Sequence, residues 1–150
     1  MKRVLSIMIM NVALICMILM FSGKSMAAMM PSGEFAGIAI ERGSANHVMY
    51  QTGGVGIEER AAMLKGVKDY SLKLIFATTK GLYLAAIPVQ IKTPEGKVIL
   101  SKESNGPWFW VNLPTGKYEV VASYKNLKRV LKVDMGITPQ SVELAWKPAR

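Results

Sequence analysis

The sequence has few of the side chains on which enzymes most often rely. Its 150 residues include one histidine, His47, and one cysteine, Cys16. A zinc centre needs three or four ligands from cysteine, histidine and carboxylates, and no such set is spaced along this chain. No serine lies in the sequence context of a nucleophile elbow. We therefore expect no catalytic residue, no metal site and no cofactor, and we do not expect an enzyme.

Acidic residues are also scarce, with 10 aspartates and glutamates against 19 lysines and arginines. The basic residues are spread along the chain, and their one cluster is Lys125, Lys128, Arg129 and Lys132. A basic hairpin could contact anionic lipid, polysaccharide or an acidic protein. Lysines that protect an exposed sheet edge are the more ordinary explanation. We take Lys125, Lys128 and Arg129 as candidate ligand-binding residues.

A long apolar run occurs only at the N-terminus, where Met-Lys-Arg precedes the nearly uncharged residues 4–23. Ser25-Met26-Ala27 follows as a small-x-Ala site, so the pattern predicts a signal peptide over residues 1–27, cleaved after Ala27. The run is also long enough to span a bilayer, which leaves an uncleaved anchor as the alternative. Cys16 lies inside the run rather than after small residues at its end, which argues against a lipoprotein.

Export would place the protein in the periplasm, or outside the cell, and disfavours a nucleic-acid partner. We expect contact with a membrane only through the leader, if it stays uncleaved. The mature chain would hold 16 basic and 10 acidic residues and no cysteine, so packing must stabilise it without a disulfide. Its length suits one domain.

Residues 28–46 show little periodicity and are interpreted as a partly ordered N-terminal arm, with a possible short strand at 37–41. Residues 47–147 are interpreted as the folded domain. There, apolar residues alternate with polar ones between turns rich in Pro, Gly and Asn, which predicts about seven antiparallel strands in an all-β sandwich. Pro88 interrupts one run and marks an edge or a bulge. The expected core positions of the last strands are Tyr118, Val120, Leu131, Val133, Val142 and Leu144.

One short helix is predicted at residues 57–65, with Glu58 and Glu59 in its first turn and Gly66 after its end. It is too short to be stable alone, so we expect it to dock on the sheet through Ile57, Ala61, Met63 or Leu64. The preceding glycines at 53, 54 and 56 do not match a phosphate-binding motif.

The segment at residues 87–124 contains IPVQI, then EGK, then SNGPWFWVNLPTGKYEVVASY. It resembles the carboxypeptidase-regulatory-like domains, which carry a turn glycine, an aromatic strand and an L-P-x-G-x-Y-x-V element. The resemblance implies a transthyretin-like or immunoglobulin-like sandwich in a small exported bacterial protein. Hydroxyisourate hydrolases share that fold but end in Tyr-Arg-Gly-Ser, whereas this chain ends in Lys-Pro-Ala-Arg. The matching residues are Gly96, Gly106, Phe109, Leu113, Pro114, Gly116, Tyr118 and Val120.

Trp108 and Trp110 flank Phe109, so on a strand the two tryptophans share one face and Phe109 lies on the other. The favoured interpretation is an aromatic core. If Phe109 points inward with Leu113, the tryptophans face outward and could stack on a sugar ring or an apolar partner. We therefore add Trp108 and Trp110 to the candidate ligand-binding residues.

The preferred hypothesis is an exported, non-enzymatic module that binds an envelope protein, or stabilises an envelope assembly, through a sheet face or an edge strand. The alternative is a carbohydrate or small-ligand binder that uses Trp108 and Trp110. The sequence does not predict the oligomeric state.

Overall fold

A computed structural model describes residues 40–148, which lie in a compact unit, Gly37–Arg150. The predicted leader at 1–27 lies outside the described residues, and so does most of the possible short strand at 37–41. Of that strand only Ile40 and Glu41 are described, and Glu41 alone is in a strand. No helix within residues 40–148 is long and apolar enough to cross a membrane.

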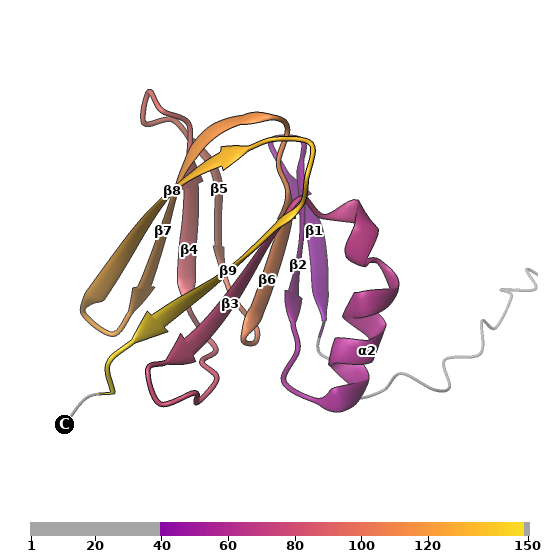
Figure 1. Cartoon of the computed structure of the whole chain (residues 1–150), viewed down its shortest axis with the longest axis vertical. Coiled ribbons are helices and arrows are strands. Elements are labelled where there is room, and N and C mark those ends of the chain that lie inside the picture. Colours follow the sequence, from indigo (N-terminus) through magenta and orange to yellow (C-terminus); the bar gives the residue numbers. More distant parts are fainter. Residues whose placement is uncertain (1–39, 149–150) are drawn as a thin grey trace, which may run out of the picture. The chain divides into compact units, whose positions relative to one another are not determined.

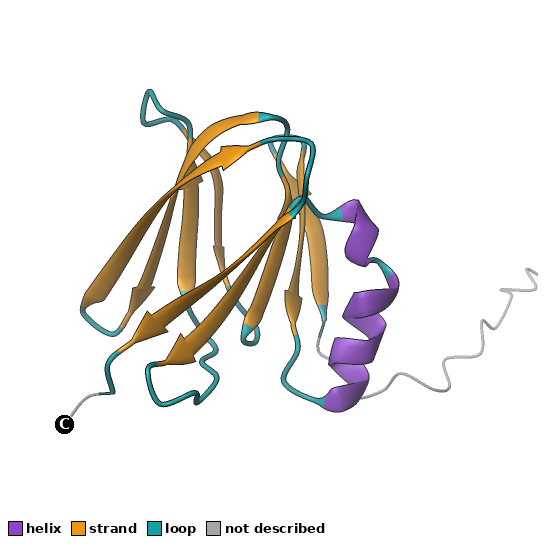
Figure 2. Ribbon diagram, viewed as in Figure 1, coloured by secondary structure: helices purple, strands orange, loops and turns teal. Residues whose placement is uncertain are grey.

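Nine strands in the described part of the chain form two sheets (Figure 1, Figure 2), which confirms the expected all-β class. The predicted number of about seven was too low. Sheet A has the order β1 (Glu41–Ala45), β2 (Val48–Gly53), β6 (Trp108–Asn112), β3 (Leu72–Thr78) and β9 (Gln140–Trp146). Sheet B has the order β5 (Val98–Glu103), β4 (Pro88–Lys92), β7 (Gly116–Tyr124) and β8 (Leu127–Met135).

The folded domain begins before the predicted boundary at residue 47. Glu41–Ala45 already pairs with β2 as the edge strand β1. Its sequence, ERGSA, contains a single small apolar residue, so it lacks the alternation that identified the other strands.

One strand pair contradicts the prediction of a wholly antiparallel sandwich. β9 runs parallel to β3, from the pair Leu72 and Gln140 to the pair Thr78 and Trp146. After β8 ends in sheet B, the chain crosses to sheet A and returns beside β3 in the same direction. Such a pairing needs a crossover between distant segments, which local alternation does not reveal.

The core lies between the sheets and is centred on fully buried Phe76, Phe109 and Trp146. Among the six expected core positions, Val120, Val133 and Leu144 are buried. The other three, Tyr118, Leu131 and Val142, are half-buried at the margin of the same cluster. The predicted side of each strand is therefore correct, and burial varies along each strand, since β7, β8 and β9 each contribute one buried and one half-buried position.

Pro88 is neither an edge residue nor a bulge. It is the first residue of β4, a central strand of sheet B, and residues 82–87 before it form a loop. A proline is tolerated at the first position of a strand because that N–H need not join the ladder. The irregularity in register falls instead between Ile91 and Lys92.

Helix α2 (Ile57–Lys65) has the predicted bounds, precedes the short 3-10 helix η1 (Val67–Asp69), and lies along sheet A (Figure 1). Of the four side chains expected to dock, only Met63 is buried, and Ile57, Ala61 and Leu64 are exposed. The helix is rotated relative to the expected orientation, because the face that packs on the sheet carries Met63 together with buried Glu59, four residues earlier. The result is a helix that presents an apolar stripe to solvent.

Side chains connect the edges of the two sheets on both sides of the sandwich. On one side, Asn46 Nδ2 on the β1–β2 turn donates to Ile99 O of β5 at 2.9 Å. On the other, Trp146 Nε1 of β9 donates to Leu127 O of β8 at 2.9 Å, and Gln140 Nε2 donates to Asp134 O at 2.7 Å.

Candidate functional site

The tryptophan strand β6 has Phe109 in the sandwich core and both tryptophans on the outer face of sheet A. The rings of Trp108 and Trp110 stack with their centroids 5.2 Å apart. Trp110 is only 3% exposed because Met63 of α2 and Tyr70 pack against it. Trp108 is half-buried. The outward orientation considered for the pair is therefore correct, but α2 covers most of the surface on which a sugar would stack.

Arg60 extends the aromatic row toward solvent. Its guanidinium carbon lies 4.6 Å from the ring centroid of Tyr83 and 5.6 Å from that of Trp108. Its Nε donates to Gly54 O at 2.7 Å, and within residues 40–148 no carboxylate is within ion-pair distance of it. Sequence reasoning missed both Arg60 and Tyr83, because residues far apart in the chain create this contact.

Gly54 allows the close approach of this loop to β6. Its φ is +85°, and a Cβ there would lie 2.9 Å from Trp108 Cγ. The amides of Gly54 and Val55 both donate to Glu59 Oε2, at 2.9 and 3.0 Å. The loop thus uses these two amides to bind the carboxylate of its own helix rather than offering them to an external phosphate.

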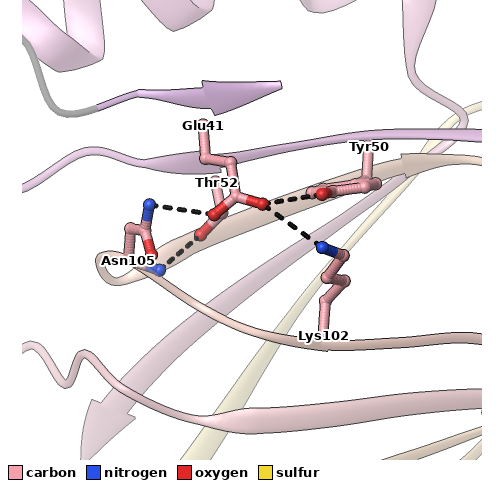
Figure 3. Close-up of polar contacts among 5 residues, drawn as sticks. All are labelled: Glu41, Tyr50, Thr52, Lys102 and Asn105. Carbon is pink, nitrogen blue, oxygen red and sulfur yellow. Dashed lines mark hydrogen bonds and ion pairs between the residues drawn. The ribbon is translucent and has the colours of Figure 1, made fainter. Parts of the chain in front are cut away.

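A polar cluster lies between the two sheets on the side of the sandwich where β1 and β5 are the edge strands (Figure 3). Tyr50 Oη donates to Glu41 Oε1 at 2.7 Å, Asn105 Nδ2 donates to Glu41 Oε2 at 3.1 Å, and Lys102 Nζ lies 3.7 Å from Oε1. The amide of Asn105 donates to buried Thr52 Oγ1 at 3.0 Å. Glu41 of β1 and Lys102 of β5 belong to different sheets, so the cluster joins the two sheets.

The cluster shifts the titration of its members. The hydrogen bond from Tyr50 lowers the pKa of Glu41, with Lys102 and Asn105 adding to the effect. Burial, and then the neighbouring Glu41, raise the pKa of Tyr50. Tyr50 also stacks on Phe109 at 5.9 Å. This is the arrangement of a structural brace, because every charged group already has a partner within the fold.

The basic candidates Lys125, Lys128 and Arg129 are exposed on the β7–β8 hairpin of sheet B. Lys125 occupies the turn with φ +52°. The tryptophans lie on sheet A, so the structure does not bring the five candidate residues into one site. It defines an aromatic surface and, separately, a basic edge.

The basic edge is strand β8, the last strand of sheet B. A two-residue turn pairs Tyr124 with Leu127, and such a closing pair is hydrogen-bonded in a tight hairpin. By alternation, Arg129 and Leu131 direct their backbone groups to β7, and Lys128 and Val130 direct theirs away. Within residues 40–148, no backbone group outside β7 is hydrogen-bonded to the β8 backbone.

A hollow of about 480 Å³ lies beside this edge, where β7, β8 and the β4–β5 turn meet. Its charged lining is mixed, and opposite charges face each other across the strands, with Lys117 opposite Asp134 and Glu119 opposite Lys132. The hollow therefore favours neither anions nor cations.

No group of three or more potential metal ligands occurs among the described residues. The chain matches no family model, no curated protein and no solved structure. A functional conclusion therefore rests on the geometry of its own surfaces.

Proposed function

We propose that this protein is an exported, non-enzymatic binding module that pairs the free edge of β8 with an extended segment of an envelope protein. The observation that carries the proposal is the nine-residue strand β8, whose first four residues are all exposed. An edge strand with free N–H and C=O groups is a template for strand addition, in which backbone hydrogen bonds supply affinity and side chains supply specificity.

The charge of the edge indicates the chemistry of the partner. Lys128 and Lys132 lie on one face of β8, Arg129 lies on the other, and all three are exposed. Directly opposed like charges destabilise a strand pair, and opposite charges stabilise it. A second copy of β8 would bring basic residues close together, so the edge favours an acidic extended segment over self-association.

The edge also carries exposed Leu127 and Val130, which distinguishes it from a purely protective charged edge. On one face of β8, Val130 lies between Lys128 and Lys132, which suits a partner strand that has both acidic and apolar positions.

The fold supports a finer proposal, that the sandwich is transthyretin-like and related to the carboxypeptidase-regulatory-like domains. The turn at Pro114 leads into β7, and Tyr118 Oη donates to Pro114 O at 3.1 Å. The L-P-x-G-x-Y pattern thus forms a turn tied to its own strand. Periplasmic location remains part of the proposal and rests on the leader sequence.

Carbohydrate binding through Trp108 and Trp110 is the weaker alternative. A sugar platform needs accessible ring faces, whereas Trp110 lies beneath α2 and each tryptophan covers part of the other.

A proline substitution tests strand addition at β8. Val130→Pro removes an outward-facing donor, whereas the matched variant Val130→Thr keeps the donor and the strand preference. Each variant, as the chain from residue 28, is used to capture partners from a periplasmic extract, with the bound segment mapped by crosslinking from Lys128. We expect Val130→Thr to capture an acidic segment and Val130→Pro to lose it. Equal capture by both variants would show that the edge is not the binding surface.

A further inference from the structure

Three loops and the end of one strand meet at one end of the sandwich, which we call the loop end. It comprises the β2–α2 loop, the β3–β4 loop, the β7–β8 turn and the end of β9, all low in Figure 1. Strand register links them: Gly53 and Ile75 both pair with Trp108, and Thr78 pairs with Trp146. Trp146 in turn donates its indole N–H to Leu127 O.

The loop end concentrates exposed apolar side chains, each more than half exposed and supplied by three separate segments. A soluble domain that presents several large apolar side chains on neighbouring loop tips usually uses them for contact. They are Val55, Ile57, Leu82, Tyr83 and Leu127.

Basic residues lie among these apolar side chains and outnumber the acids. The exposed acids at the loop end are Glu58 and Glu103, and the nearby Glu41 is already paired with Lys102. Excess positive charge around apolar loop tips matches the layered chemistry of an anionic lipid surface, with phosphates outside and acyl chains beneath. The basic residues are Arg60, Lys80, Lys125, Lys128, Arg129 and Lys147.

Arg60 has the geometry of a phosphate ligand at such a surface. The rings of Tyr83 and Trp108 flank its guanidinium, and one hydrogen bond to Gly54 O fixes its Nε. Among residues 40–148 its outer N–H groups have no acceptor, which suits them to a phosphate oxygen. Tyr83 is more than half exposed, and tyrosine rings favour the headgroup region of membranes, which accommodates both their apolar body and their polar hydroxyl.

We propose that the loop end binds the surface of an anionic membrane, with Ile57 and Leu82 entering the interface and Arg60 and the hairpin lysines contacting phosphates. This proposal shares Lys128 and Arg129 with the edge of β8. It does not depend on strand addition there, because Ile57, Arg60 and Leu82 lie outside that strand. Strand β1 also begins at this end, since its first residue, Glu41, pairs with Thr52 near the end of β2. The apolar run at residues 4–23 precedes it in the sequence.

Vesicle sedimentation tests the proposal, using residues 28–150, which contain the whole compact unit and exclude the apolar leader. Vesicles of phosphatidylglycerol and phosphatidylcholine are compared with vesicles of phosphatidylcholine alone. We expect binding to the anionic vesicles that falls as salt is raised. Ile57→Glu and Leu82→Glu should each weaken it by about tenfold or more, because each removes a buried apolar side chain from the interface.

Ile137→Glu is the matched control, since Ile137 is 99% exposed on the turn between β8 and β9, at the opposite end. It should bind as the unsubstituted chain does. Lys125→Glu should weaken binding to the anionic vesicles about fivefold or more, as expected for a basic residue near a charged surface. Circular dichroism and thermal melting confirm that each variant is folded.

Two results would overturn the proposal. One is the absence of binding to anionic vesicles at low salt, and the other is equal weakening by Ile137→Glu and Ile57→Glu. If a soluble envelope protein binds instead, and Ile57→Glu abolishes that complex without any vesicle binding, the loop end is a protein interface and not a membrane surface.

Discussion

The two tryptophans of β6 occupy different environments although only Phe109 separates them in the sequence. Trp110 is enclosed by Met63 and Tyr70, whereas Trp108 lies at the boundary with solvent beside Arg60. Within residues 40–148 both indole N–H groups are buried without a hydrogen-bond acceptor. Trp110 therefore contributes through packing and ring contacts rather than through its polar edge.

Trp110→Ala should destabilise the domain by about 3–5 kcal/mol, the usual cost of removing a buried large aromatic side chain. Trp108→Ala should cost clearly less because its ring is already partly solvated. Urea denaturation of both variants measures the difference. A Trp110→Ala variant as stable as the unsubstituted chain would contradict the packing of α2 on this face.

Glu41 should make stability depend on pH in the acidic range. Its pKa is lowered from an ordinary value of 4.5, so the folded state favours the charged carboxylate. The associated stability is fully present above that value and is lost as pH falls through the lowered pKa. Glu41→Gln should remove this component. Between about pH 5 and about pH 3, where carboxyl groups ordinarily titrate, the melting temperature of the variant should therefore change less than that of the unsubstituted chain. An unchanged pH dependence would rule out the brace in Figure 3.

At the scale of elements, α2 depends on an acid that holds the loop before it. Glu59 is buried and accepts two amide hydrogen bonds, whereas neighbouring Glu58 is exposed. Both lie in the first turn, so their contributions to the helix dipole are similar.

Glu59→Ala should therefore destabilise the domain by about 1–3 kcal/mol or more, because two amides lose their charged acceptor. Glu58→Ala, the matched control, should be within about 0.5 kcal/mol of the unsubstituted chain. Chemical denaturation provides both values. Similar losses in the two variants would mean that the loop amides are satisfied without Glu59.

Local pattern predicted those elements whose burial is regular. Alternating apolar residues around Val120 and Val133 identified β7 and β8, because one face of each strand is buried. The acids before Met63 identified α2. β1 was missed because ERGSA has no apolar alternation, and the parallel placement of β9 was missed because it depends on a crossover. The contact of Arg60 with Tyr83 and Trp108 has no local signal, since tertiary packing brings three distant segments together.

For the whole molecule, the edges of the sandwich are not equivalent. Side chains connect β1 to β5 through Glu41 and Lys102, and connect β9 to the two ends of β8. Between those ends, β8 has no backbone partner other than β7 among the described residues. Exposed edges are usually protected, so a long edge with exposed apolar side chains is the feature that most favours a binding function.

Amide hydrogen exchange, followed by NMR on residues 28–150, tests this central claim most directly. In the free chain, Arg129 and Leu131 should exchange slowly because their amides bond to β7, whereas Lys128, Val130 and Lys132 should exchange rapidly. Addition of the captured acidic segment should slow the exchange of Val130. Slow exchange of Val130 in the isolated chain at low concentration would contradict the account, because the edge would already be covered.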